Sequence, residues 1–188
     1  MKKTFLLLLA AFISLSSFAQ TQWKVDPYHS SLNFNIEHSG ISIVNGKFLE
    51  YTGNLTTNGE ALKGADVDFT VKVNSINTNV DKRDSHLKSA DFFDVEKFPN
   101  MTFKSTKIES KGKDQYLLHG KLTIKDVTKD VVFDVHYGGT VKSQQGEKLG
   151  VKATTTINRF DYNINYDPTA TSLAKDVSII LHLQFAKQ

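Results

Sequence analysis

The chain lacks cysteine entirely, and it contains only three prolines and one tryptophan among its 188 residues. Without cysteine no disulfide framework can hold the fold together, so stability must come from a hydrophobic core. Long apolar runs are scarce as well. The one from Phe5 to Ile13 is well short of the roughly 20 residues that a membrane-spanning helix needs. We therefore expect no stable insertion into a membrane.

The same apolar run has the flanks of an export signal. Lys2 and Lys3 precede it, and the small-residue exit Ser17-Phe18-Ala19 follows it. This arrangement is typical of a secretory signal peptide. We predict that residues 1–19 are removed, and that residues 20–188 form a single domain in the periplasm or outside the cell.

Neither sign of charge dominates. The chain has 23 basic and 20 acidic residues, a formal net charge of +3, and removal of Lys2 and Lys3 would leave +1. Binding to nucleic acid requires clustered basic charge. We therefore expect no nucleic acid partner.

Apolar and polar residues alternate with period two along much of the chain, which is typical of strands with one buried and one solvated face. The alternating segments are 32–36, 67–73, 101–105, 118–124, 131–137, 151–157 and 177–185. With residues 46–51 they amount to about eight strands. Short turn signals between them favour an all-β, eight-stranded, up-and-down antiparallel barrel over a two-sheet sandwich.

One charged insert interrupts the strands between Asp81 and Phe103. Asp81 is expected to cap a short helix around residues 82–91, and Pro99 prevents the helix from continuing. Phe92 and Phe93 cannot both point into the core from one helix face. We expect one ring to seal the end of the barrel and the other to pack under the loop.

Several short motifs follow one another in a characteristic order. They are Trp23-Lys24-Val25-Asp26-Pro27-Tyr28-His29-Ser30, Gly46-Lys47-Phe48, Arg83-Asp84-Ser85-His86-Leu87, Asp91-Phe92-Phe93-Asp94, Phe98-Pro99 and Gly120-Lys121-Leu122-Thr123-Ile124. With these motifs the sequence resembles the YceI-like family of secreted bacterial lipid-binding proteins. The resemblance implies a lipocalin-like barrel whose interior takes a polyisoprenoid, an isoprenoid quinone or a fatty acyl compound. Such a carrier needs no cofactor and no metal.

The alternation also predicts which side chains face the interior. The predicted ligand-binding set is Phe34, Ile36, His38, Phe48, Val67, Phe69, Val71, Phe92, Phe93, Phe103, Leu122, Phe133, Ile157, Arg159, Ile179 and Leu181; Ile124, Val135 and Leu183 share the inward parity. The residues alone leave open whether these side chains fill a solid core or line a cavity. The family resemblance favours the cavity.

Arg159 is the one charged residue in this set. A buried guanidinium needs a partner, so we expect it to pair with a carboxylate such as Asp26, Asp84 or Asp161, or to meet a lipid headgroup at the barrel mouth.

Two other classes of function stay open at this point. A hydrolase-type enzyme could use His29 and His86 at the barrel mouth, although the chain has neither a Gly-x-Ser-x-Gly nor a His-Glu-x-x-His motif. We expect no catalysis and predict that these two histidines fasten the N-terminal turn and the helix to the barrel rim. A structural module without ligand is the other alternative. The oligomeric state is open too, a homodimer included.

Overall fold

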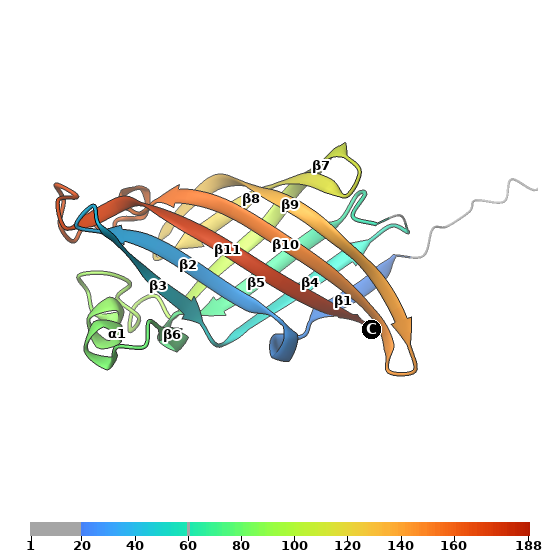
Figure 1. The fold of residues 1–188 in the computed structure, drawn as a ribbon, viewed down its shortest axis with the longest axis horizontal. Helices are drawn as coiled ribbons and strands as arrows, with labels where there is room; N and C mark the ends of the chain where they lie inside the picture. Colours follow the sequence, from blue (N-terminus) through green and yellow to red (C-terminus); the bar gives the residue numbers. More distant parts are fainter. Residues whose placement is uncertain (1–19, 60) are drawn as a thin grey trace, which may run out of the picture.

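The computed structural model describes residues 20–59 and 61–188, which form one antiparallel sheet with short helices (Figure 1). The strands are β1 (Thr21–Val25), β2 (Ser31–His38), β3 (Ser42–Phe48), β4 (Tyr51–Thr57), β5 (Asp66–Lys72), β6 (Ile76–Asn77), β7 (Asn100–Gly112), β8 (Gln115–Ile124), β9 (Val127–Ser143), β10 (Gly146–Asn158) and β11 (Leu173–Lys187). The helices are α1 (Asp81–Lys88) and the 3-10 turns η1 (Pro27–His29), η2 (Val73–Ser75) and η3 (Arg159–Tyr162). None of the helices in these two ranges is long and apolar enough to cross a bilayer.

The sheet closes on itself as a barrel of eight strands. Its order is β1-β4-β5-β7-β8-β9-β10-β11, and β11 pairs back with β1 through Phe185 and Val25. The prediction of an eight-stranded, up-and-down antiparallel barrel with a short helix is confirmed. Closure leaves no free edge in this ring, which removes the risk of edge-to-edge pairing.

Three further strands lengthen one part of the wall. β2 pairs with β11, β3 with β2, and the short β6 with β3. In the described residues β6 pairs with no other strand, so the wall opens between β6 and β7. The helix α1 and residues 89–99 lie in the chain between these two strands, and α1 lies beside β6 (Figure 1). The insert thus covers the opening.

The strands differ from the sequence prediction in several bounds, and most clearly at β1 and at residues 46–51. β1 was not expected, although Trp23 and Val25 are buried and alternate with exposed neighbours. Residues 46–51 do not form one strand, because the chain bends at residues 49–50, between the end of β3 and the start of β4. Each of these segments is too short for the period of two to stand out.

The helix starts and ends differently as well. It runs from Asp81 to Lys88, and its N-cap is Val80 rather than Asp81. The expected capping by Asp81 was wrong. The carboxylate that accepts hydrogen bonds from the backbone before the helix belongs to the buried Asp84. Asp84 accepts hydrogen bonds from the backbone amide of Thr78, at 2.8 Å, and from its hydroxyl.

Candidate functional site

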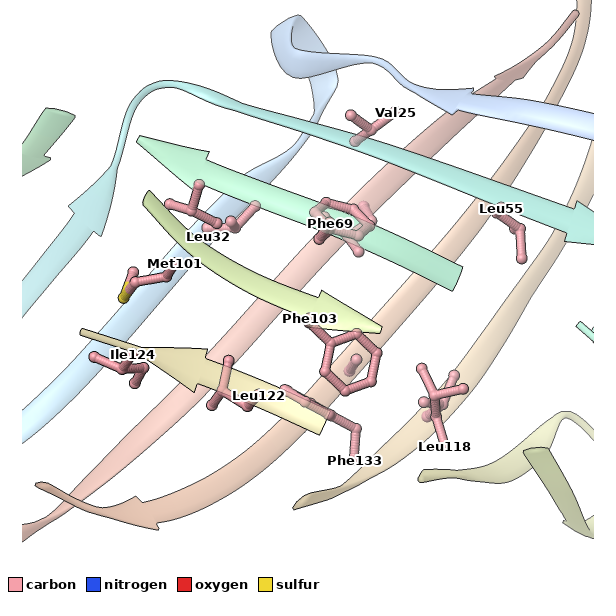
Figure 2. Close-up of a cluster of buried hydrophobic side chains, with 14 of the residues drawn as sticks. Val25, Leu32, Leu55, Phe69, Met101, Phe103, Leu118, Leu122, Ile124 and Phe133 are labelled. Atoms are coloured by element: carbon pink, nitrogen blue, oxygen red, sulfur yellow. The ribbon is translucent and has the colours of Figure 1, made fainter. Parts of the chain in front are cut away.

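The barrel encloses an inner cavity of about 150 Å³ that is lined almost wholly by apolar side chains from all around the barrel wall. Figure 2 shows Phe69, Phe103, Leu122 and Phe133 on neighbouring strands at this level of the barrel. Alternation along each strand places these side chains inside and their polar neighbours outside. An apolar surface of this kind favours a hydrocarbon over any polar ligand.

A second, outer cavity of about 380 Å³ lies under α1 and the loop before β11. The helix and the segment after it contribute Arg83, His86, Leu87, Phe92 and Phe93 to its lining. Phe93 packs edge-on against Phe48 of the barrel wall, with ring centroids 6.1 Å apart. Phe92 packs instead against His86 and Tyr166, with centroids 5.0 Å and 4.8 Å away.

The two cavities are neighbours along the barrel axis. They share five lining residues, which are Phe34, Phe48, Met101, Ile124 and Ile179. Beyond the outer cavity, a more open and polar groove of about 430 Å³ shares His38, Val44 and Arg83 with it. The lining therefore changes from wholly apolar inside to partly polar at the mouth.

The opposite end of the barrel is closed by packed side chains. Trp23 and Leu149 are buried there and line neither cavity. They pair across strands with Leu55 and Phe185, which do line the inner cavity. The indole Nε1 of Trp23 donates to the hydroxyl of Thr57 at 3.0 Å. This packing of the described residues favours entry of a chain from the end that carries α1.

The sixteen residues of the predicted ligand-binding set all line at least one of the two cavities. Ile36, His38, Phe92, Phe93, Ile157 and Arg159 line the outer one alone. His38 is exposed at its rim rather than enclosed. Binding of a ligand by these residues stays a prediction.

Arg159 is buried, but the expected ion pair was wrong. Its side chain donates to five backbone carbonyls, those of Ile164, Tyr166, Asp167, Leu173 and Ala174. Those five bonds employ every N–H of the guanidinium. Burial lowers the pKa of Arg159 from its ordinary value. Its role is to hold residues 163–172 down over the outer cavity.

Tyr162 follows on the same turn, is only 1% exposed, and lines the outer cavity. Its hydroxyl is buried and has no hydrogen-bond partner within the described residues. Burial raises the pKa of the phenol to about 12, so the hydroxyl stays protonated and able to donate.

The two histidines considered for catalysis do not meet in either cavity. His29 lines neither one and pairs with Asp26 of its own turn at 2.8 Å. This hydrogen bond is the largest cause of a lowered pKa of Asp26. His86 pairs with Asp91 at 2.9 Å. Within residues 20–59 and 61–188, no group of three or more His, Cys, Asp or Glu residues is placed to hold a metal ion.

The prediction that His29 fastens the N-terminal turn to the barrel was only partly right. The N-terminal turn is tied to β11 by Asp26 and Ser30, which bond the side chain and backbone of Gln184. His29 acts only through Asp26.

Several lining residues escaped the sequence prediction. They include Leu55, Leu62 and Phe185 in the inner cavity, and Val44, Leu87, Tyr162, Ile164, Tyr166 and Leu173 in the outer one. Tyr162, Ile164 and Tyr166 of the outer group lie on a turn and the loop after it, where no period marks the buried face. Leu55 and Phe185 did alternate with polar neighbours, so the signal for those two was present.

Comparison with known proteins gives a consistent picture. The model of the YceI-like domain matches residues 23–185. A UPF0312 protein of Pseudomonas putida strain W619 is 35% identical over 184 residues, which cover 95% of each chain. A UPF0312 protein of Shewanella baltica strain OS185 is 31% identical over 182 residues, covering 93% of this chain and 95% of its own.

Solved structures share the barrel. The YCEI protein of Campylobacter jejuni superposes with a TM-score of 0.74 at 32% identity, covering 81% of this chain and 90% of its own. BcnA of Burkholderia cenocepacia reaches 0.78 at 21% identity, covering 85% and 98%. A polyisoprenoid binding domain from Saccharophagus degradans reaches 0.70 at 14% identity, covering 88% and 98%; these last two show likeness of fold alone.

Proposed function

The chain belongs to the YceI-like family, and from that premise we propose that it is a periplasmic carrier that holds one long apolar ligand inside its barrel. The ligand is a polyisoprenoid, an isoprenoid quinone or a fatty acyl compound. The observation that carries the proposal is the pair of neighbouring cavities, apolar within and partly polar at the mouth.

The energetics favour long ligands. Burial of a CH₂ group contributes about 0.8 kcal/mol, so a tail of some twenty carbons gains roughly 16 kcal/mol. Association costs about 4–15 kcal/mol in lost freedom. A short tail does not offset this cost, whereas a long tail does.

The polar groups at the mouth suit a head that carries oxygen. The protonated hydroxyl of Tyr162 can donate to a carbonyl, hydroxyl or ether oxygen. Arg159 uses all five of its N–H donors to hold the loop before β11 and the first residues of that strand. This loop then covers the head of the ligand. The His29 and His86 pairs offer no nucleophile with an adjacent base in the cavity, which favours a binding protein over a hydrolase.

The proposal is tested by purifying the protein from the periplasm of its native source, followed by organic extraction and mass spectrometry. One long-chain lipid per barrel is expected. The matched variants Val71→Trp, which fills the inner cavity, and Thr70→Trp, on the neighbouring position of β5, separate specific from adventitious lipid. Lipid lost only from the first variant supports the carrier. Protein that yields no lipid, or equal lipid from both variants, contradicts it.

The export prediction needs its own test, because residues 1–19 lie outside the described residues. We expect the mature chain in the periplasmic fraction to begin at Gln20. N-terminal sequencing that finds Met1 on the purified protein would contradict this part of the proposal.

A further inference from the structure

Three inward positions of the barrel wall carry glycine instead of an apolar side chain. They are Gly46 on β3, Gly53 on β4 and Gly120 on β8, and all three are buried. A phenylalanine ring from the neighbouring strand covers each of them, namely Phe34, Phe69 and Phe103 respectively. A Cβ atom added at any of these glycines would lie less than 3.0 Å from the distal carbons of the ring.

The strand register explains how the rings reach the glycines. Phe34 is the direct cross-strand partner of Gly46, and Phe69 is that of Gly53. Partners of this kind project from the same face of the sheet. Since the glycine leaves room at the wall, each ring lies over its neighbouring strand and not toward the barrel axis.

A second aromatic ring packs beside each of the three. Phe48 lies 5.8 Å from Phe34, Phe185 lies 6.2 Å from Phe69, and Phe133 lies 5.4 Å from Phe103, measured between ring centroids. These neighbours occupy the space to one side along the wall. The bore is open space beside these rings, so we expect a ring that is pushed off its glycine to turn toward it.

We propose that the glycines set the width of the chain that the barrel admits, by letting these phenylalanine rings lie against the wall. The inference rests on the proposed function and deepens it. A chain with methyl branches needs a wider bore than a straight chain, so the branched chain depends on the glycines most. Gly46 acts between the two cavities, because Phe34 lines both of them, whereas Gly53 acts on the inner cavity through Phe69.

The test substitutes Gly46→Ala and Gly53→Ala and compares them with Gly150→Ala. Gly150 lies on β10, and nothing lies within 4 Å of a Cβ added there. Gly120 is left unchanged, because the backbone oxygen of Lys104 would lie 2.6 Å from its Cβ and the fold itself would suffer. The probes are geranylgeraniol, which is methyl-branched, and eicosanol, a straight alcohol with the same number of carbons.

We expect Gly53→Ala to weaken binding of geranylgeraniol about tenfold or more, the scale of one misfitted methyl group, and to weaken binding of eicosanol less. Gly150→Ala should bind both alcohols as the wild type does. The double variant Gly53→Ala with Phe69→Leu should recover geranylgeraniol, because the shorter side chain leaves the bore free. Circular dichroism confirms that each variant is folded.

Crystal structures of the two alanine variants provide a readout without ligand. Rings of Phe34 and Phe69 that have turned into the bore support the inference, and rings that stay against the wall overturn it. A wild type that binds neither alcohol contradicts the carrier function, while the ring positions still decide the present inference. A wild type that binds both, with variants that bind both equally well, overturns the inference and leaves the carrier function standing.

Discussion

Replacing Arg159 with Met removes the five N–H donors that hold the loop before β11, while an unbranched apolar side chain still fills the space. The guanidinium spans the loop and the first residues of β11, since its acceptors are the carbonyls of residues 164, 166, 167, 173 and 174. In the variant these carbonyls lose their donor. The loop must then either stay in place with unsatisfied oxygens or open to water.

The expected loss can be bounded from these contacts. A hydrogen bond from a charged donor contributes about 1.5–3 kcal/mol, and five independent bonds would exceed the total stability of many domains. The loop can open and let water replace the guanidinium, so the five contributions do not add. We expect Arg159→Met to lower the free energy of unfolding by about 3–5 kcal/mol, the scale of breaking a buried charged pair.

Urea unfolding measures the total loss, and amide hydrogen exchange locates it. Fast exchange should appear in residues 163–172, while the barrel strands keep their protection. The matched control is Arg83→Met at the only other arginine of the chain, which donates two hydrogen bonds to Thr78. Because Arg83 is only half-buried, water can replace these bonds, and we expect a loss of about 1–2 kcal/mol. Equal losses in the two variants, with unchanged exchange in the loop, would show that Arg159 does not hold residues 163–172 in place.

Three further predictions concern Tyr162, Asp167 and the two histidines considered for catalysis. Folding raises the pKa of Tyr162 from 10.0 to about 12. Its contribution to the free energy of unfolding is therefore complete below pH 10 and should fall by roughly 2–3 kcal/mol as the pH rises to 12. The free energy of unfolding of Tyr162→Phe, measured across this range, should lack that part of the fall. Two backbone amides lower the pKa of Asp167 below 3.8. The stabilisation of the folded state by this carboxylate is therefore present above pH 3.8 and is lost as the pH falls through the lowered pKa. Asp167→Asn should reduce the melting temperature at pH 7 and weaken its acid dependence, and an unchanged profile would count against the loop contacts. His29→Ala and His86→Ala should retain lipid binding in a titration; a hydrolytic activity that both substitutions abolish would favour the enzyme instead.

The barrel was predictable because its strands obey a period of two. Each long strand has one face toward the interior, so the parity of Phe34, Phe69 or Leu181 determined which way it points. Short turns and uniform alternation favoured a barrel over a sandwich, and the family resemblance implied the barrel as well. The resemblance was also needed to choose between a filled core and a cavity, since parity does not report how much space the side chains leave.

The mouth could not be predicted in the same way. Arg159 binds carbonyl groups, which every residue carries, so no residue type in the sequence marks its partners. Tyr166 and Leu173 reach the outer cavity from a loop and a strand start, where backbone geometry and not periodicity sets their direction. The role of Gly46 and Gly53 could not be predicted from the sequence either, because it depends on which phenylalanine ring of the neighbouring strand covers each glycine.

The central claim is that a hydrocarbon chain runs from the mouth into the inner cavity. The most direct measurement is a crystal structure of the protein with a fatty acid brominated at its terminal carbon. We expect an anomalous bromine peak inside the barrel, between Phe103 and Phe185, with the carboxyl group of the fatty acid near Tyr162. A peak on the outer surface, or a barrel interior that excludes the bromine, would contradict it.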